Sequence, residues 1–486
     1  PAREALKVAL CELGIQADVF SAYKPLLQFF LENKDWQDSI RIEIHYPVHP
    51  AADSKRFLLE AYPLARILHD KEQVWTAFEV HASEQHLQYM VTLTDRLGHS
   101  TAHTVEAPNQ IFTDHLDQNT LCPTGLLRVT HSETGELIHR VFFQTEIQQA
   151  YQQVMRWITT HPWGHAEPYF ERMLIRVDLP GAELFDPQGT TLASTLEALH
   201  EDLYFSILEF FQQHSGRPTG DRGLQPGQIV PDIRMGSGHV SIGIHLYPVG
   251  EALPPLSIDQ DKKYSPETGF ADADSFADLE TLSRPIRATA VDHLLSKFDA
   301  KAFETVSRQA RVALGIVRTG AKPAIVLTGG QHANEPSGVV GALRAGAWLA
   351  SVPEAHFALV PLENPDGYQL YQQYCTLHPQ HMHHAARYTG LGDDLEYREQ
   401  PPWYEKSARM HAVQATSAQL HLSLHGYPAH EWTRPFTGYV PRGFELWSIP
   451  KGFFLIVRYQ SAYKARAHQW LEIITAEIAL IPGLAE

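Results

Sequence analysis

Residues 324–338, Ala-Ile-Val-Leu-Thr-Gly-Gly-Gln-His-Ala-Asn-Glu-Pro-Ser-Gly, constrain the fold of this chain most strongly. Residues 324–328 are apolar and partly β-branched, which predicts a short buried strand. Two glycines end that strand, and Pro336 suits the first turn of a helix because its missing N–H would be unpaired there. Strand, turn and helix in this order indicate an open α/β sheet, whose ligands bind at the carboxyl edge.

His332 and Glu335 lie on the turn between this strand and helix. A His-x-x-Glu pair brings one imidazole nitrogen and one carboxylate within reach of a single cation. A catalytic zinc takes three protein ligands and leaves one position open, so a third ligand is needed. Residues 420–424 alternate apolar and polar side chains, which predicts a strand that ends at His425. His425 is therefore the third candidate, at the same sheet edge.

Three motifs occur in a fixed order: His332-x-x-Glu335, Asn364-Pro-Asp-Gly-Tyr368 and Ser423-Leu-His-Gly426. Together they resemble the zinc carboxypeptidase (carboxypeptidase A-like) family, over about residues 285–486. The resemblance implies a Zn²⁺ ion held by His332, Glu335 and His425, as in the His₂Glu site of carboxypeptidase A. It implies a zinc metallopeptidase with a mixed sheet flanked by helices.

Two further residues take roles from the same resemblance. Arg387 matches the arginine that stabilises the oxyanion of the tetrahedral intermediate, where a guanidinium opposes developing negative charge; a plain surface arginine is the alternative. Asp394 matches the aspartate that orients a zinc-binding histidine. The Asn364-Pro-Asp-Gly motif predicts a tight turn, with direct contact to substrate as the alternative.

The sequence departs from the family pattern where the substrate's terminal carboxylate should bind. Glu396 and Tyr397 stand in place of an Asn-Arg pair. A glutamate there would repel a carboxylate unless Arg398 or another cation compensates. Carboxypeptidase specificity is therefore less well supported than zinc hydrolysis.

The general base is a second departure. In the family it is a glutamate on a later strand, yet residues 463–481 predict only the helix that precedes such a strand. Either the catalytic domain is truncated and the base lies beyond residue 486, or Glu431 has taken this role.

Three functions fit these observations. The first is a zinc metallopeptidase that hydrolyses peptide bonds by metal-activated water. The second is a zinc amidohydrolase on N-acyl amino acids, similar to succinylglutamate desuccinylase and aspartoacylase, in which the sequence His332-Ala-Asn-Glu335 is also at home. The third is a catalytically inactive zinc-binding homologue.

Length and periodicity predict an α/β protein with several parts: an α+β accessory domain (residues 1–164), a second accessory region with a linker (165–260) and the catalytic domain (261–486). Prolines and charged residues make the stretch from residue 248 to about residue 278 the best linker candidate. The predicted elements before the linker are two helices in residues 4–34 broken near 14–18, strands at 40–46, 74–81 and 87–94, a hairpin of 126–131 and 136–144, a helix at 146–160, a strand at 173–177, a helix at 192–213 and a strand at 240–247. A strand at 356–362 is predicted to lie parallel to the strand at 324–328.

The composition of the chain limits the kinds of molecule that the protein is expected to bind. The net charge of −17 argues against nucleic-acid binding, which needs a basic footprint. The chain has no long apolar run, no apolar leader and three scattered cysteines, so we expect a soluble cytoplasmic protein without a disulfide framework or membrane contact. The substrate is expected to be a peptide or an acylated amino acid.

The chain has 28 histidines, more than one metal site can use, and two segments that contain them could bind a further metal or be solvated. Residues 378–384 hold four of them and are expected to form a solvated loop, with a second metal site as the alternative. His200 and Glu201, on the predicted helix at 192–213, are expected on a partly solvated face.

Overall fold

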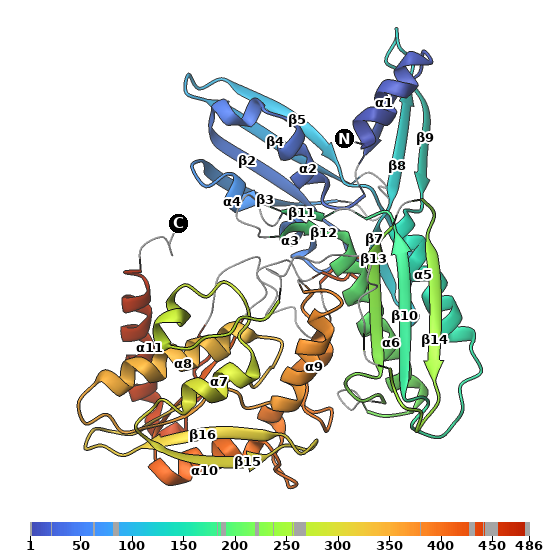
Figure 1. Cartoon of the computed structure of the whole chain (residues 1–486). Coiled ribbons are helices and arrows are strands. Elements are labelled where there is room, and N and C mark those ends of the chain that lie inside the picture. Colours follow the sequence, from blue (N-terminus) through green and yellow to red (C-terminus); the bar gives the residue numbers. More distant parts are fainter. Residues whose placement is uncertain are drawn as a thin grey trace. The chain divides into compact units, whose positions relative to one another are not determined.

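The computed structural model describes the chain except for residues 1, 21, 62–63, 81–86, 182, 186–190, 219–222, 237, 255, 257–268, 380, 427–432, 441, 443–454 and 482–486. It is a mixed α/β structure with several sheets, shown in Figure 1. None of its described helices combines the length and the apolar character needed to cross a membrane.

Contacts within the chain divide it into two compact units. The first consists of Pro1–Phe112, Asn119–Gln144 and Gly438–Glu486, and the second of Thr113–Gln118 and Thr145–Thr437. The candidate metal ligands His332, Glu335 and His425 all belong to the second unit. The boundaries at residues 164 and 260 remain predictions.

The first unit is built on two antiparallel or mixed sheets, with strand orders β1-β8-β9 and β3-β2-β4-β5, and on the pair β6-β7. Its elements are α1 (Ala2–Glu12), β1 (Gln16–Phe20), α2 (Pro25–Glu32), β2 (Ser39–Val48), α3 (Arg56–Glu60), α4 (Leu64–Ile67), β3 (Glu72–Glu79), β4 (Gln88–Asp95), β5 (Ser100–Glu106), β6 (Asn109–Thr113), β7 (Asn119–Pro123), β8 (Gly125–Thr130), β9 (Leu137–Phe143) and α11 (Lys464–Ile478). The two predicted helices, the strands and the hairpin are confirmed. The predicted break between the helices contains the start of strand β1, which Gly14 and Asp18 had hidden.

The second unit begins with a three-stranded sheet covered by long helices. Strand β10 (Arg172–Leu179) pairs in parallel with β13 (Ile229–Met235) and antiparallel with β14 (Ser241–Tyr247). Helix α5 (Glu146–Thr160) and helix α6 (Thr195–His214) are both capped, by the side chains of Thr145 and Ser194. The short pair β11 (Glu183–Phe185) and β12 (Thr191–Ser194) leads into α6.

The rest of the second unit is a five-stranded mixed sheet with the order β15-β16-β18-β17-β19. Strands β17 (Ile325–Gly329), β18 (Phe357–Val360) and β19 (Leu420–Leu424) are mutually parallel, as predicted for the first two. The antiparallel strands β15 (Lys301–Val306) and β16 (Val312–Arg318), which we did not predict, extend the sheet on the β18 side.

Helices cover both faces of this sheet. Alternate residues of the central strands point to opposite sides: Leu327 and Leu359 pack with α7 (Ala288–Leu295), α8 (Pro336–Ser351) and α9 (Pro365–Cys375). Val326 and Ala358 pack with Ala408 and Ala412 of α10 (Lys406–Thr416) on the other side. Figure 1 shows α10 across the sheet from α7 and α8.

The predicted linker is only partly described, and its end is not a linker. Ala273 and Leu279 are buried in the same core as α7 and α8, and Phe270 packs against that core. A 3₁₀ turn, Phe276–Glu280, begins with a capping box between Ser275 and Asp278. Burial of these apolar side chains outweighs the local charge and proline content that predicted a linker.

Candidate metal centre

The register of two parallel strands brings the three predicted ligands together. Gly329 of β17 pairs with Leu424 of β19, so His425 follows its strand at the level where the 329–335 turn leaves β17. Glu335 Oε1 lies 2.9 Å from His332 Nδ1, and Glu335 Oε2 lies 2.9 Å from His425 Nδ1. The two Nδ1 atoms are 3.2 Å apart. These three side chains form one of the two clusters in the described chain with metal-binding geometry.

Glycines allow helix α8 to lie close to the end of strand β19. A Cβ atom on Gly338, in the first turn of α8, would lie 2.4 Å from the carbonyl oxygen of Leu424 and 3.1 Å from the Cα of His425. Gly330 has a φ of +62°, a left-handed conformation that favours glycine. The helix that carries Glu335 at its N-cap therefore lies directly against the strand that carries His425.

The polar contacts suit a divalent cation at the centre of the triangle. His332 has a carboxylate oxygen beside each ring nitrogen: Glu335 at Nδ1 and Asp394 Oδ2 at Nε2, 3.0 Å away. His425 points its own Nδ1 at the same Glu335 carboxylate. A neutral imidazole cannot donate at both nitrogens, and two N–H groups aimed at each other would repel. A metal ion that accepts a lone pair from each of the two nitrogens and from Glu335 removes both conflicts. Two imidazoles and one carboxylate are a ligand set that zinc uses.

The electrostatics of the cluster agree with this geometry. Burial opposes a charge on Glu335, but hydrogen bonds from His332 and His425 outweigh it and lower the pKa of Glu335 to about 2. Burial would lower the pKa of His332, yet its hydrogen bonds with Asp394 and Glu335 raise it. Glu335 is therefore ionised at neutral pH, as a metal ligand must be.

Asp394 and Arg387 border the triangle. Asp394 Oδ2 contacts His332 Nε2, and its Oδ1 accepts a hydrogen bond from Gln331 at 3.0 Å. Arg387 reaches Glu335 Oε1 and Asp394 Oδ2, both at 3.3 Å. The guanidinium thus places positive charge beside the candidate metal position. Gln331 was not predicted, and only its place next to His332 signalled it.

The Asn364-Pro-Asp-Gly motif is the start of α9 and not a separate tight turn. The Asn364 side chain accepts a hydrogen bond from the Gly367 N–H and donates one to the Tyr388 carbonyl. Asp366 accepts hydrogen bonds from Ser307 and from the Gln309 N–H. Both side chains are used inside the protein, which argues against the alternative of direct substrate contact.

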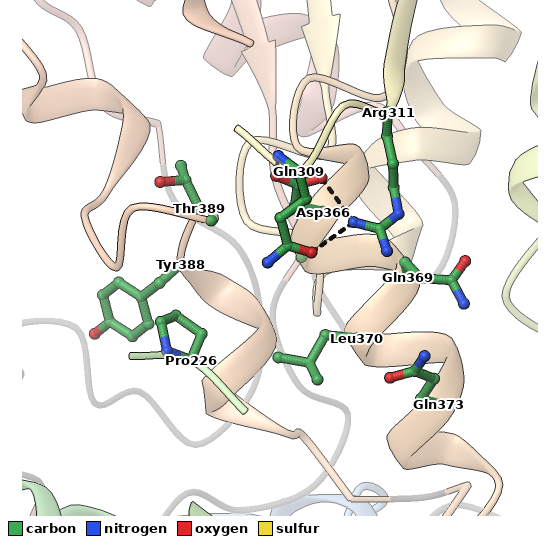
Figure 2. A pocket seen from close by; sticks show the side chains of 11 residues that line it. Pro226, Gln309, Arg311, Asp366, Gln369, Leu370, Gln373, Tyr388 and Thr389 are labelled. Atoms are coloured by element: carbon green, nitrogen blue, oxygen red, sulfur yellow. Dashed lines mark hydrogen bonds and ion pairs between the residues drawn. The ribbon is translucent and has the colours of Figure 1, made fainter. Parts of the chain in front are cut away.

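A small hollow lies beside this helix start. Figure 2 shows Tyr388 and Thr389 on one side of it and Arg311, paired with Asp366 at 2.9 Å, on the other. Its volume of about 60 Å³ has room for only a few water molecules. It is too small to hold a peptide.

The segment that departs from the family pattern is held by internal ion pairs. Arg409 of α10 binds Glu363 through two hydrogen bonds of 2.7 and 2.6 Å and also contacts Glu396 at 2.6 Å. Arg398, with 4% of its side chain exposed, pairs with Asp393 and Glu405. Arg409, and not Arg398, compensates the charge of Glu396. Tyr397 is exposed.

Glu431, the candidate general base within the sequence, lies outside the described residues. Its role stays a prediction.

The histidine-rich segment is buried, so the expectation of a solvated loop is wrong. His378, His381, His383 and His384 are each no more than 6% exposed. His200 and Glu201 of α6 are also buried, contrary to the predicted solvated face. The loop packs on α6 and β13, which precede it by well over a hundred residues. The residues next to the loop in the sequence therefore could not predict this contact.

Comparison with known proteins adds little. No family model matches the sequence, and no curated protein matches it. Among solved structures, a provisionally assigned carboxypeptidase from Burkholderia mallei aligns with 21% identity and a TM-score of 0.24 over 31% of this chain and 41% of that one. A metallo-carboxypeptidase from Pseudomonas aeruginosa, in complex with (2-guanidinoethylmercapto)succinic acid, aligns with 18% identity and a TM-score of 0.23 over 30% and 40%. The aligned part spans about two fifths of each of those chains, and similarity at this level identifies neither a family nor an activity for this one.

Proposed function

We propose that this protein is a zinc-dependent hydrolase of amide bonds, with peptides as the first substrate class. The observation that carries the proposal is the convergence of His332, Glu335 and His425 on one point, with Arg387 alongside. A bound zinc ion would supply a polarised carbonyl and an acidified water molecule.

The residues of this chain would divide the remaining work. His332, Glu335 and His425 hold the metal, and Asp394 fixes the orientation of the His332 ring through its Nε2. Arg387 would stabilise negative charge on the carbonyl oxygen during attack. A carboxylate must take the proton of the attacking water and pass it to the leaving amine, and Glu431 is the candidate for that step.

The charge balance of the site supports an anionic transition state. Glu335 and Asp394 contribute two negative charges, and Arg387 contributes one positive charge. A divalent ion would give the group a net charge of +1, which favours a developing oxyanion.

Metal analysis and hydrolysis assays of the full chain test the proposal together. We expect Arg387→Met to keep its zinc and to lower kcat on an N-acyl dipeptide by roughly 10²–10³-fold. His425→Ala should lose the zinc of this site and all activity. Arg308→Met, which changes an arginine with no contact to the metal triangle, serves as the matched control. Zinc retained at full stoichiometry in His425→Ala would rule out the ligand assignment.

A second candidate is an amidohydrolase that acts on N-acyl amino acids. It is favoured by the absence, among the described residues of segment 389–409, of an arginine left over to bind a terminal carboxylate, because Arg398 and Arg409 are both engaged by carboxylates. Hydrolysis of N-acyl amino acids but not of dipeptides would select it. Zinc binding at this site without hydrolysis of either substrate class would instead support an inactive binding protein.

A further inference from the structure

A second cluster with metal-binding geometry lies on helix α6. Glu197, His200 and His381 each offer one ligand atom, and these atoms lie within 4.8 Å of one another. Glu197 and His200 are one turn apart on the same face of α6, and His381 comes from the loop after α9. None of the three takes part in the metal centre described above.

The geometry of the cluster suits a small cation. Glu197 Oε2 lies 3.4 Å from His381 Nδ1, close to the ligand-to-ligand distance of roughly 3.3 Å in a tetrahedral zinc site with bonds of about 2.05 Å. The rings of His200 and His381 have centroids 4.9 Å apart. The other oxygen, Oε1, accepts the backbone N–H of Met382 at 3.1 Å, which fixes the carboxylate orientation.

Burial and charge make a cation favourable there. Glu197, His200 and His381 are 3%, 2% and 6% exposed, and Glu201, a further carboxylate one turn along α6, is fully buried. Two carboxylates buried this close need compensating positive charge or a shared proton. Arg434, which lies beside α6, pairs with Asp202 and Glu209, and His384 lies 3.0 Å from Glu201.

The imidazole of His200 provides an independent indication. Its Nδ1 is buried, and within the described chain it has no hydrogen-bond partner. Glu201 Oε1 is 3.8 Å away, beyond hydrogen-bond distance. A buried imidazole nitrogen without a hydrogen-bond partner is unfavourable unless another group satisfies it.

We propose that Glu197, His200 and His381 bind a second divalent ion of the first transition row, with Zn²⁺ as the preferred metal. Two imidazoles and one carboxylate match zinc and its neighbours and disfavour Ca²⁺ and Mg²⁺, which prefer oxygen ligands. The ion fastens the described loop residues 378–379 and 381–384 to α6. Because Arg387 lies only three residues after that loop, the second ion also fixes the position of the backbone from which the Arg387 side chain extends.

Neighbouring histidines hold the loop that carries His381 against α6 and β13. His384 Nε2 lies 3.0 Å from Glu201, and His378 Nε2 lies 3.1 Å from Asp232 of β13. His383 Nε2 contacts the His378 carbonyl at 2.7 Å. The loop is thus held on both sides of His381, which leaves that imidazole aimed at Glu197.

Zinc stoichiometry of the full chain tests this proposal. The chain is stripped with a chelator, titrated with Zn²⁺ against a coloured competitor, and examined by native mass spectrometry. We expect two equivalents in the parent, one in His381→Ala, one in His332→Ala and none in the double variant. His214→Gln is the control: it changes a histidine at the last residue of α6, 14 residues along the helix from His200, and should retain both ions.

The possible outcomes separate this proposal from the proposed function. A parent that binds one ion, lost in His332→Ala and kept in His381→Ala, overturns the second site and leaves the first. One ion kept in His332→Ala and lost in His381→Ala supports the second site and removes the hydrolase proposal. If His381→Ala fails to fold, Glu197→Gln gives the same readout with little change in volume, and an ion count that Glu197→Gln leaves unchanged overturns the second site.

Discussion

At the scale of single residues, the metal centre depends on the absence of side chains as much as on their presence. A Cβ at Gly338 would overlap the Leu424 carbonyl oxygen, whereas one at Gly341 would meet only Leu424 Cδ1, at an ordinary 3.7 Å. We predict that Gly338→Ala moves β19 away from α8 and lowers zinc affinity by roughly 10–100-fold, the range for a displaced supporting group. A competition titration measures it.

Gly341→Ala is the matched control in the same helix. It should keep the parent's zinc affinity and stabilise the protein by about 0.5–1 kcal/mol, because alanine favours a helix interior over glycine. Equal zinc affinities in the two variants would show that the approach of α8 to β19 does not position His425.

Asp394 permits a second prediction at this scale. Its Oδ2 contacts His332 Nε2, so Asp394→Ala removes the group that orients the ring. Zinc affinity should fall by about 10–100-fold while the three ligands stay in place. Asp393→Ala, which disturbs only the contacts with Thr389 and Arg398, should retain the parent's affinity. Both values come from the same chelator competition.

Sequence reasoning was most informative for residues whose neighbours are close in the chain. The β17–α8 segment carries its strand, its glycines and its Pro336 within fifteen or so positions, so its structure could be predicted. The partners of His378, His381 and His384 lie on α6 and β13, and the partner of Glu396 is Arg409 of α10. Such pairings depend on tertiary packing, which local hydrophobicity does not encode.

At the scale of elements, buried ion pairs fasten helices and loops to the sheets. Arg409 joins α10 to Glu363, which follows β18, and Glu363 is fully buried. Replacing Glu363 by Gln leaves the guanidinium of Arg409 buried with a weaker partner. We predict a loss of about 3 kcal/mol in the free energy of unfolding, measured by urea denaturation. An unchanged midpoint would mean that Glu396 alone satisfies Arg409.

The contact between β13 and the histidine-rich loop should make the free energy of unfolding depend on pH in the acid range. Burial opposes ionisation of Asp232, but His378 and Arg234 outweigh it and lower its pKa to about 2. The ordinary value is about 3.9, so the folded state holds this proton less tightly than the unfolded state. The ionised carboxylate therefore contributes about 2–3 kcal/mol of stability above pH 4, and this contribution is lost as the pH falls towards 2.

Asp232→Asn isolates that contribution. The variant should be less stable than the parent at pH 7 by about 2 kcal/mol, and the difference should shrink as the pH falls from 4 towards 2. Urea unfolding at a series of pH values measures it. A difference that stays constant across this range would contradict the assigned electrostatic role.

Strand β15 and strand β16 show where element prediction failed. The residues of β15 alternate between exposed and half-buried, so their apolar signal is weak. Their place in the sheet comes from pairing with β16, and β16 in turn pairs with β18. Both pairings are set by neighbours that the residues of β15 do not reveal.

At the scale of the whole molecule, both clusters with metal-binding geometry in the described chain belong to the second unit. Metal should therefore stabilise that unit selectively. With free zinc at 100 times its dissociation constant, one site adds about 2.7 kcal/mol to the free energy of unfolding. We predict that a chelator lowers the melting temperature of one calorimetric transition and leaves another unchanged. A uniform shift of all transitions would indicate that the units unfold together.

The first unit is assembled from stretches that lie far apart along the polypeptide: its strands come from residues before Gln144, and Gly438–Glu486 joins them after the second unit is complete in the sequence. Tyr439 lies 4.5 Å from the Arg56 guanidinium, within that late stretch and that early one. During synthesis, which runs from the N-terminus, residues 145–437 leave the ribosome before Tyr439 does. The part of the first unit that precedes residue 145 must then wait for the part that follows residue 437 before the unit is complete.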